Sequence, residues 1–243
     1  ADVNLIEINK ELRKIQKKNL NYFKKTKVRW LKTINLKSKL PSIIYSNEFF
    51  DCFPVRQFLN YNNIWFEKYI KFNDKEKKYY SINKRVNNKK ILDHLGKYKK
   101  QKIYEVSYSR NKYFEEICKY LKKNRGLCIL IDYGYNKNIK NFTLQSIYNH
   151  KKTSIFENIG QQDISSHVNF GELIEIAKKN KLKIDEFDTQ RDFLIKYGIL
   201  ERKQKLISKN FNIKKNLLNE EVDRLINVDR MGKLFKCLVV SNL

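Results

Sequence analysis

The sequence predicts an α/β protein whose mostly parallel sheet carries helices on both faces, with an antiparallel β insertion. Strand-like apolar segments alternate with helical ones before residue 54 and again after residue 104. Between these positions, apolar and polar residues alternate and the breaks are rich in asparagine, which is typical of an antiparallel meander. We therefore divide the chain into core residues 1–53, an insertion or cover layer over residues 54–104, and the rest of the core over residues 105–243.

The first part opens with an apolar run over residues 3–8, which predicts a buried parallel strand. Asn9 is placed to cap a helix that follows at once, and Glu11 lies in its first turn. Residues 28–34 and 42–46 predict the next two strands. The order is therefore strand, helix, strand, strand before the insertion begins.

The insertion and the second part follow the same rules. Alternation predicts insertion strands over residues 54–61, 64–72 and 77–82. After residue 104 the predicted elements are a helix over 109–124 ended by Gly126, a strand over 127–133, a strand or extended loop over 142–148, a helix over 169–180 capped by Asn169, a strand over 182–187, a helix capped by Thr189, a helix over 213–226 and a strand over 234–240.

Charge and cysteine content limit the possible partners. The 52 lysines and arginines exceed the 26 acids and give a net charge of +26. This excess is typical of nucleic-acid binding, but the lysines are spread along the whole chain beside many Asn and Ile residues. We favour lysines in ordinary solvent positions, since no RNA- or DNA-binding motif is present. The four cysteines lie far apart and the three histidines show no zinc spacing, which predicts reduced thiols and no metal site. No apolar run is long enough to span a membrane.

Ligands of such sheets bind beyond the carboxyl ends of the strands, so the residues that follow strands are the candidates. Glu7 ends the first strand and can accept hydrogen bonds from both hydroxyls of a ribose, although an acid there is also a common dipole partner of the next helix. Asp132 closes the apolar strand over residues 127–133, and Gly134 permits a turn or a close ligand approach there. The alternative at Asp132 is a capped strand end.

Residues 47–51 combine an amide, two acids and two aromatic rings directly after a strand. Glu48 and Asp51 can hold a guanidinium group by charge-assisted hydrogen bonds, and aromatic rings can flank its flat face. Alternatively, the phenylalanines fill the core and both acids face water. A last candidate is His167, which lies beside Asp163, two serines and a helix start, where it suits orientation or proton transfer. The alternative at His167 is a purely structural histidine.

Together these segments resemble the MidA-like methyltransferases. Residues 47–58 read NEFFDCFPVRQF and are similar to the family signature "NEFFDALPVRQF". Further matches, in the same order, are LIDYGY at 130–135, TLQ at 143–145, DISSHVNF at 163–170, TQ followed by FL and GI from 189 to 199, and MGKLFK at 231–236.

The resemblance implies a Rossmann-like class I methyltransferase that uses S-adenosyl-L-methionine. Its expected activity is N-methylation of an arginine in a core subunit of respiratory complex I during assembly, in the cytoplasm of a bacterium or in the mitochondrial matrix of a eukaryote. The site residues that we assign are Glu48, Asp51 and His167 for catalysis, Glu7 and Asn47 for the cofactor, and Phe49, Phe50, Asp132 and Tyr133 for the substrate.

The chain departs from the family pattern at its start. The family's glycine-rich loop, E-x-G-x-G-x-G, would precede Ala1, so we expect an N-terminally truncated chain. Lys32 also stands near the place where relatives carry an acid facing adenine. The alternatives to the enzyme are an assembly or scaffold protein that has lost the cofactor, and a basic nucleic-acid-binding protein.

Overall fold

The computed structural model describes residues 2–21, 27–34, 40–209 and 215–243, and the chain forms two compact units over residues 1–41 and 42–243. The first unit contains β1 (Asp2–Ile6), α1 (Lys10–Leu20) and β2 (Lys27–Leu31), and β1 and β2 pair in parallel. Asn9 caps α1 as predicted, because its Oδ1 accepts hydrogen bonds from the N–H groups of Glu11 at 2.9 Å and Leu12 at 3.2 Å.

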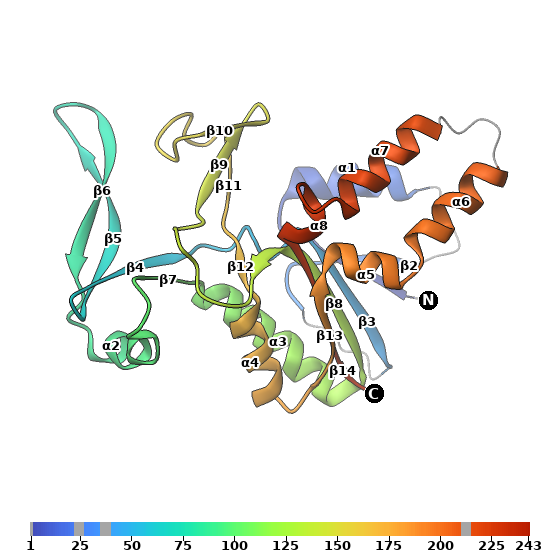
Figure 1. The fold of residues 1–243 in the computed structure, drawn as a ribbon, viewed down its shortest axis with the longest axis horizontal. Coiled ribbons are helices and arrows are strands. Elements are labelled where there is room, and N and C mark those ends of the chain that lie inside the picture. Colours follow the sequence, from blue (N-terminus) through green and yellow to red (C-terminus); the bar gives the residue numbers. More distant parts are fainter. Residues whose placement is uncertain (1, 22–26, 35–39, 210–214) are drawn as a thin grey trace. The chain divides into compact units, whose positions relative to one another are not determined.

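The main sheet of the second unit is built around β8, and Figure 1 shows its long strands side by side. Its strands are β3 (Ser42–Asn47), β8 (Gly126–Tyr135), β12 (Val168–Asn169), β13 (Lys183–Thr189) and β14 (Phe235–Asn242). Strands β3 and β12 pair with β8 in parallel, whereas β14 lies between β8 and β13 and is antiparallel to both. The last strand runs against its neighbours because the chain enters it from α8 (Met231–Leu234) beside the carboxyl end of β8.

Helices cover both faces of this sheet, which confirms the predicted fold class. Ile131 and Cys237 face one side, where they pack with Phe193 of α5 (Gln190–Lys196) and Met231 of α8. The alternate residues, such as Leu130, are buried on the other side. There the sheet contacts α3 (Tyr108–Asn124) and α4 (Phe170–Lys179), which also contact each other.

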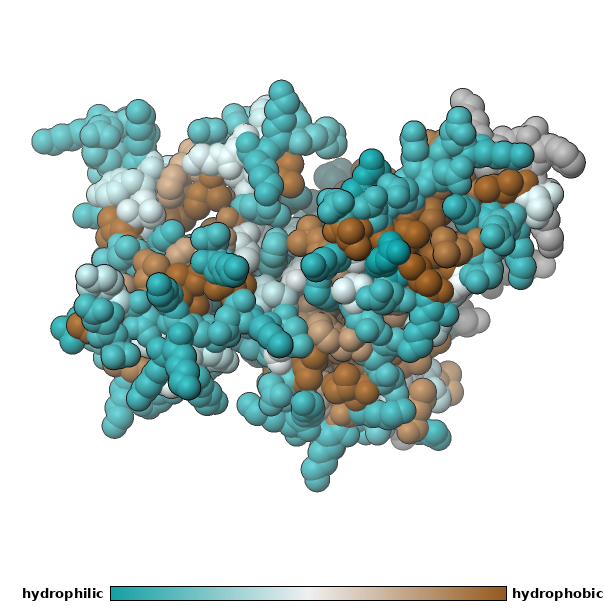
Figure 2. Space-filling model, viewed as in Figure 1, coloured by the Kyte–Doolittle hydropathy of each residue, from teal (hydrophilic) through white to brown (hydrophobic). Residues whose placement is uncertain are grey.

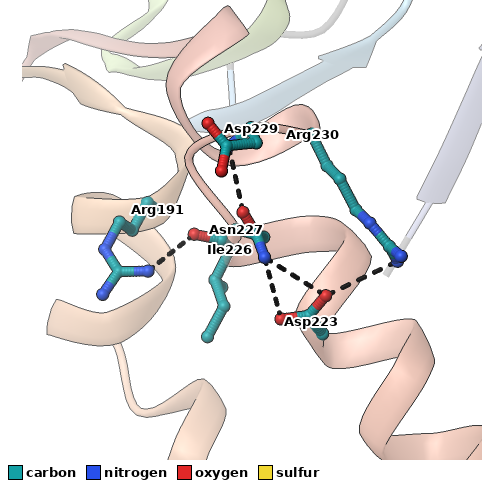
Figure 3. A network of polar contacts seen from close by, with 6 residues as sticks. All are labelled: Arg191, Asp223, Ile226, Asn227, Asp229 and Arg230. Atoms are coloured by element: carbon teal, nitrogen blue, oxygen red, sulfur yellow. Dashed lines mark hydrogen bonds and ion pairs between the residues drawn. The ribbon is translucent and has the colours of Figure 1, made fainter.

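The two sequence segments that resemble TQ and MG motifs meet at the start of β14 and serve packing. Thr189 caps α5, as predicted, and Gln190 donates to the carbonyl oxygen of Leu225 at 2.9 Å. Arg191 donates to the carbonyl oxygen of Ile226 at 2.8 Å, at the end of α7 (Lys215–Ile226). Figure 3 shows this contact beside the polar network of the α7–α8 connection. The motifs therefore hold α5 against the chain that leads into β14.

A four-stranded antiparallel sheet, here called the cover sheet, occupies most of the predicted insertion. Its strands are β4 (Arg56–Tyr61), β5 (Ile64–Asn73), β6 (Lys78–Arg85) and β7 (Ile103–Val106), in the order β6-β5-β4-β7. Figure 1 shows β5 and β6 as a long hairpin. Phe58, Trp65 and Tyr104 form its core together with α2 (Lys89–Leu95) and the 3₁₀ turn η1 (Gly96–Tyr98). Helix α2 was not among the elements predicted for the insertion.

Several smaller elements were not predicted, and for residues 142–148 the sequence had left a strand or an extended loop open. Strands β9 (Gln145–Tyr148), β10 (Lys151–Thr153) and β11 (Asp163–Ser165) form a second antiparallel sheet. Helix α6 (Ile199–Lys209) precedes α7, whose predicted start at residue 213 lies outside the described residues. The strands of this small sheet are three or four residues long, too short for a pattern of alternation to identify them.

The expectations drawn from composition can now be compared with the structure. All four cysteines are free, and Cys128 and Cys237 are fully buried in the sheet. Among the described residues, no helix is both long and apolar enough to cross a membrane. Figure 2 shows hydrophilic residues over most of the face that it presents, with hydrophobic residues in patches between them.

Candidate functional site

The predicted acidic turn follows β3 and comprises residues 48–51, here called the Glu48 turn. Glu48 adopts a left-handed backbone conformation with φ of 47°, and its N–H donates to the carbonyl oxygen of Ile131 at 3.1 Å. Because a non-glycine residue rarely adopts this conformation, the chain must be held there by its surroundings. The side chains of Asn47 and Glu48 are both exposed, with Asn47 Nδ2 3.4 Å from Glu48 Oε1. The Glu48 carboxylate is therefore open to a ligand.

Asp132 of β8 fixes the backbone of this turn. Its side chain is fully buried, and its Oδ2 accepts the N–H groups of Phe49 at 3.2 Å and Phe50 at 3.0 Å. Its Oδ1 accepts the N–H of Tyr133 at 3.0 Å. Burial, together with the negative charge of Asp51, raises the pKa of Asp132 to about 7. In this structure Asp132 holds the turn through its backbone N–H groups and offers no surface to a substrate.

Phe50, expected at the substrate, fills the core instead. It is fully buried and packs edge-on against Phe114 of α3, with ring centroids 6.0 Å apart, and face to face with Phe53 at 5.9 Å. Phe49 is half-buried and contacts Phe50 edge-on at 5.4 Å. Of the two alternatives drawn from the sequence, core filling describes Phe50, while Phe49 keeps part of its ring in contact with solvent.

Asp51, Tyr133 and His167 lie together beside the turn. The Tyr133 hydroxyl donates to Asp51 Oδ2, and the Tyr133 ring meets His167 edge-on with centroids 5.4 Å apart. Burial and the hydrogen bond to Asp51 raise the pKa of Tyr133 above its usual range, so the phenol stays protonated. Burial lowers the pKa of His167, which keeps its imidazole neutral at physiological pH. Asp51 is only 9% exposed, so Glu48 is the open acid of the turn.

Sequence analysis missed Arg110, a buried arginine in the first turn of α3. Its side chain reaches the backbone of both the Glu48 turn and residues 163–168, here called the His167 segment. It lies one turn before Phe114, on the apolar side of α3. An arginine at such a position, where the spacing calls for an apolar residue, was the available signal.

The family-like residues TLQ form a second support. Glu105 is 3% exposed, and its Oε2 accepts hydrogen bonds from the Thr143 N–H at 3.0 Å and from the Thr143 hydroxyl at 2.5 Å. Thr143 Oγ1 in turn accepts the N–H of His167 at 3.0 Å. Gln57 of the cover sheet donates to Glu105 Oε1 at 2.7 Å. These residues hold the His167 segment rather than a ligand.

Gly134 has a packing role in this structure. A Cβ atom built on it would lie 2.2 Å from the carbonyl oxygen of Val168 and 2.8 Å from the Phe170 ring. Glycine is therefore needed because β12 and α4 approach β8 closely, and the expected turn or ligand approach is replaced by protein contacts.

Glu7 lies in the first unit, just after β1. Its N–H donates to the carbonyl oxygen of Leu31 at 3.1 Å, and its Oε1 accepts the N–H of Asn9 at 2.8 Å. A carboxylate has about four lone-pair positions, so this bond leaves acceptor capacity for ribose hydroxyls. The ribose role of Glu7 therefore stays a prediction with which these contacts are compatible.

A cavity of about 530 Å³ lies at the start of α4, with Tyr98, Tyr104, Tyr135 and Glu172 in its wall. No residue predicted for the site lines it. Among the described residues, no group of three or more His, Cys, Asp or Glu side chains is arranged to hold a metal ion.

Comparison with known proteins places these features in a family. Residues 1–187 match the model of the family described as "Putative S-adenosyl-L-methionine-dependent methyltransferase". The chain belongs to this family. The match confirms the resemblance drawn from residues 47–58 and the later motifs, and the cofactor of the family is the predicted S-adenosyl-L-methionine.

Two curated relatives of the family are named protein arginine methyltransferases. The mitochondrial protein arginine methyltransferase NDUFAF7 of Danio rerio is 26% identical over 204 residues, which are 83% of this chain and 47% of that protein. The homologue of Caenorhabditis elegans is 25% identical over 181 residues, which are 73% of this chain and 42% of that protein. The chain thus spans about half the length of the curated relatives it matches.

Solved structures share the fold. An uncharacterised protein from Burkholderia thailandensis superposes with a TM-score of 0.85 at 21% identity, covering 98% of this chain and 66% of that one. A second structure from the same organism, solved with S-adenosyl-homocysteine bound, gives a TM-score of 0.82 at 21% identity, covering 98% of this chain and 63% of that one. Both support the α/β methyltransferase fold.

Proposed function

We propose that this chain acts in S-adenosyl-L-methionine-dependent N-methylation of a protein arginine. Its proposed substrate is a core subunit of respiratory complex I, modified during assembly of the complex. The family supports the cofactor and reaction, and the names of the two curated relatives support arginine as the acceptor. The observation that carries the proposal is the open Glu48 carboxylate on a turn whose backbone is held at Ile131 and Asp132.

On the acceptor side, Glu48 binds the guanidinium of the substrate arginine. A guanidinium is a poor nucleophile because its lone pairs are delocalised, and a carboxylate localises its positive charge on the nitrogens that it contacts. Asp51 supports Glu48 from the same turn by holding the Tyr133 hydroxyl. The partly exposed rings of Phe49 and Tyr133 flank the proposed position of the flat guanidinium.

Proton transfer falls to His167. The methylated nitrogen must lose a proton, and a neutral imidazole can accept it. Burial lowers the pKa of His167 and keeps the ring in this neutral form. Its position against Tyr133 places the imidazole on the same side of the sheet edge as Asp51.

On the cofactor side, Glu7 accepts hydrogen bonds from the ribose hydroxyls, and Asn47 contributes a polar contact at the end of β3. When bound, the cofactor supplies an electrophilic methyl group on a sulfonium. The protein then has to align the guanidinium nitrogen with that methyl group and exclude water from both. The proposed location is the cytoplasm in a bacterium, or the mitochondrial matrix in a eukaryote, and the names of the two relatives describe those proteins as mitochondrial.

Calorimetric titration with S-adenosyl-L-methionine tests the cofactor part of this proposal. The chain is measured alone and joined to an upstream segment that carries a glycine-rich loop, and Glu7→Gln is the matched variant in each form. We expect binding in the extended form and a weaker affinity in Glu7→Gln, because an amide is a poorer acceptor for two hydroxyl groups. If neither form releases heat on titration, the result contradicts the proposal and favours a scaffold protein. Salt-sensitive binding of an RNA oligonucleotide would favour the nucleic-acid alternative.

A further inference from the structure

One buried cation connects the two loops that carry all the proposed catalytic residues. The Glu48 turn holds Glu48 and Asp51, and the His167 segment holds His167. Between them lies the side chain of Arg110, which is 3% exposed. The two loops are more than 100 residues apart in the sequence, so they depend on contacts such as this one for their relative position.

The bonds of Arg110 divide between the two loops. Its Nε donates to the carbonyl oxygen of Phe50 at 2.7 Å, in the Glu48 turn. Its Nη1 donates to the carbonyl oxygen of His167 at 3.1 Å, and its Nη2 donates to Ser166 Oγ at 2.8 Å and, at 3.5 Å, to the Ser166 carbonyl oxygen. The loops also meet directly, because the N–H of Ser166 donates to the Asp51 carbonyl oxygen at 3.0 Å.

The shape of the guanidinium matters for these contacts. Its donors are arranged in a rigid planar fork, whereas a lysine offers one flexible ammonium that cannot reach acceptors on both loops in the same geometry. Burying a cation is costly and lowers its pKa, yet Asp132 and Asp51 lie near enough for their negative charges to oppose that loss. The same Asp132 holds the N–H groups of Phe49 and Phe50. A buried guanidinium and a buried carboxyl group thus fix the same peptide segment through its carbonyl and its N–H groups.

We propose that Arg110 is a positioning residue for methyl transfer, which sets the distance between the Glu48 turn and the His167 segment. This inference rests on the proposed function. Arg110 contacts neither substrate nor cofactor. It acts through Phe50, two residues after Glu48, and through the backbone of His167 itself. Loss of the fork lets the acid and the imidazole move relative to each other while leaving Glu7, in the other unit, unchanged.

The test compares Arg110→Lys with Arg191→Lys in the extended protein. Arg191 is the matched control because it also donates to a backbone carbonyl, but its acceptor is Ile226 at the end of α7 and belongs to neither loop (Figure 3). Transfer of a tritiated methyl group to a recombinant complex I core subunit gives kcat and KM, and calorimetry gives the Kd for S-adenosyl-L-methionine. All measurements are made well below the melting temperature of each variant.

We expect kcat of Arg110→Lys to fall by roughly 100-fold, because small displacements of reacting groups are costly, with Kd within about twofold of wild type. Arg191→Lys should retain kcat within about threefold. Ser166→Ala removes a single bond of Arg110, and its expected loss of kcat is about threefold to tenfold. Ser166→Ala also provides a variant that folds if Arg110→Lys does not.

Amide hydrogen exchange gives a readout that is independent of turnover. In Arg110→Lys, exchange should quicken in peptides covering residues 48–53 and 163–168, and remain unchanged in residues 183–189 of β13. If the wild-type protein transfers no methyl group, the proposed function is overturned, and this inference with it. The positioning role alone is overturned if the wild type is active and kcat is unchanged in both Arg110→Lys and Ser166→Ala. It is also overturned if the wild type is active and Arg110→Lys loses kcat and cofactor affinity in parallel.

Discussion

Replacing Phe50 by alanine separates a core residue from a substrate contact. The ring is fully buried among Phe49, Phe53, Tyr113 and Phe114, with centroid distances of 5.4–6.2 Å. Removing a phenylalanine side chain from such a site costs about 3–5 kcal/mol, which includes the lost transfer free energy and the cavity left behind. We place Phe50→Ala in the upper half of this range, because four aromatic contacts are lost and β3, β8 and α3 surround the site.

Urea unfolding followed by circular dichroism measures this loss in the transition of the second unit. Tyr61→Ala is the control, because Tyr61 is 70% exposed and should change the unfolding free energy by less than about 0.5 kcal/mol. Phe50→Leu should cost much less than Phe50→Ala, since it retains most of the apolar volume. A loss below about 1 kcal/mol in Phe50→Ala would show that the ring is not a core residue, and the substrate contact would again be open.

Three further predictions concern the supports of the site. The pKa of Asp132 is about 7 in the folded state and about 3.9 when unfolded. The unfolding free energy should therefore fall by up to about 4 kcal/mol as pH rises from about 4 to 7. Urea unfolding of Asp132→Asn should lack this dependence on pH. Gly134→Ala should lower the unfolding free energy by about 1–3 kcal/mol in the same assay, because its Cβ would collide with the Val168 carbonyl, and no loss would contradict the close approach of β12. Arg56→Met should cost about 1–3 kcal/mol at pH 7 by removing the 2.5 Å pair with Glu67. Burial raises the pKa of Glu67, but the hydrogen bond from Arg56 lowers it overall. The loss of unfolding free energy in Arg56→Met should therefore shrink as pH falls below about 4, where Glu67 becomes protonated. An equal loss at pH 3 would contradict the pairing.

Much of the fold was predictable because its elements are long and periodic. Strand β8 begins with an apolar run over residues 126–131, α3 shows an apolar stripe, and the caps Asn9, Asn169 and Thr189 begin their helices as predicted. The sequence could not show that β14 lies between β8 and β13, since pairing order depends on contacts between distant segments. Strand β9 lies within residues 142–148, which were predicted as a strand or extended loop, whereas β10 and β11 escaped prediction because they bury few side chains and are held mainly by backbone pairing.

The candidate site was predictable by location but less so by role. Position at the end of a predicted strand selected Asp51 and Tyr133, and in the structure both contact each other beside His167. It could not distinguish the exposed Glu48 from the buried Phe50, because a turn of four residues points its side chains in different directions. Arg110 was missed since a charged residue on a helix is ordinarily assigned to solvent. Burial of such groups becomes visible only when the carbonyl groups that compensate for it are in place.

The measurement that tests the central claim most directly is methyl transfer by Glu48→Gln in the extended protein. Glutamine keeps the size of the side chain and removes the charge that binds the guanidinium. With tritiated S-adenosyl-L-methionine and a recombinant complex I core subunit, wild type should label an arginine. Glu48→Gln should bind the cofactor with unchanged Kd and lose at least about 100-fold in kcat. Labelling by Glu48→Gln at the wild-type rate would contradict the account of this turn as the arginine site.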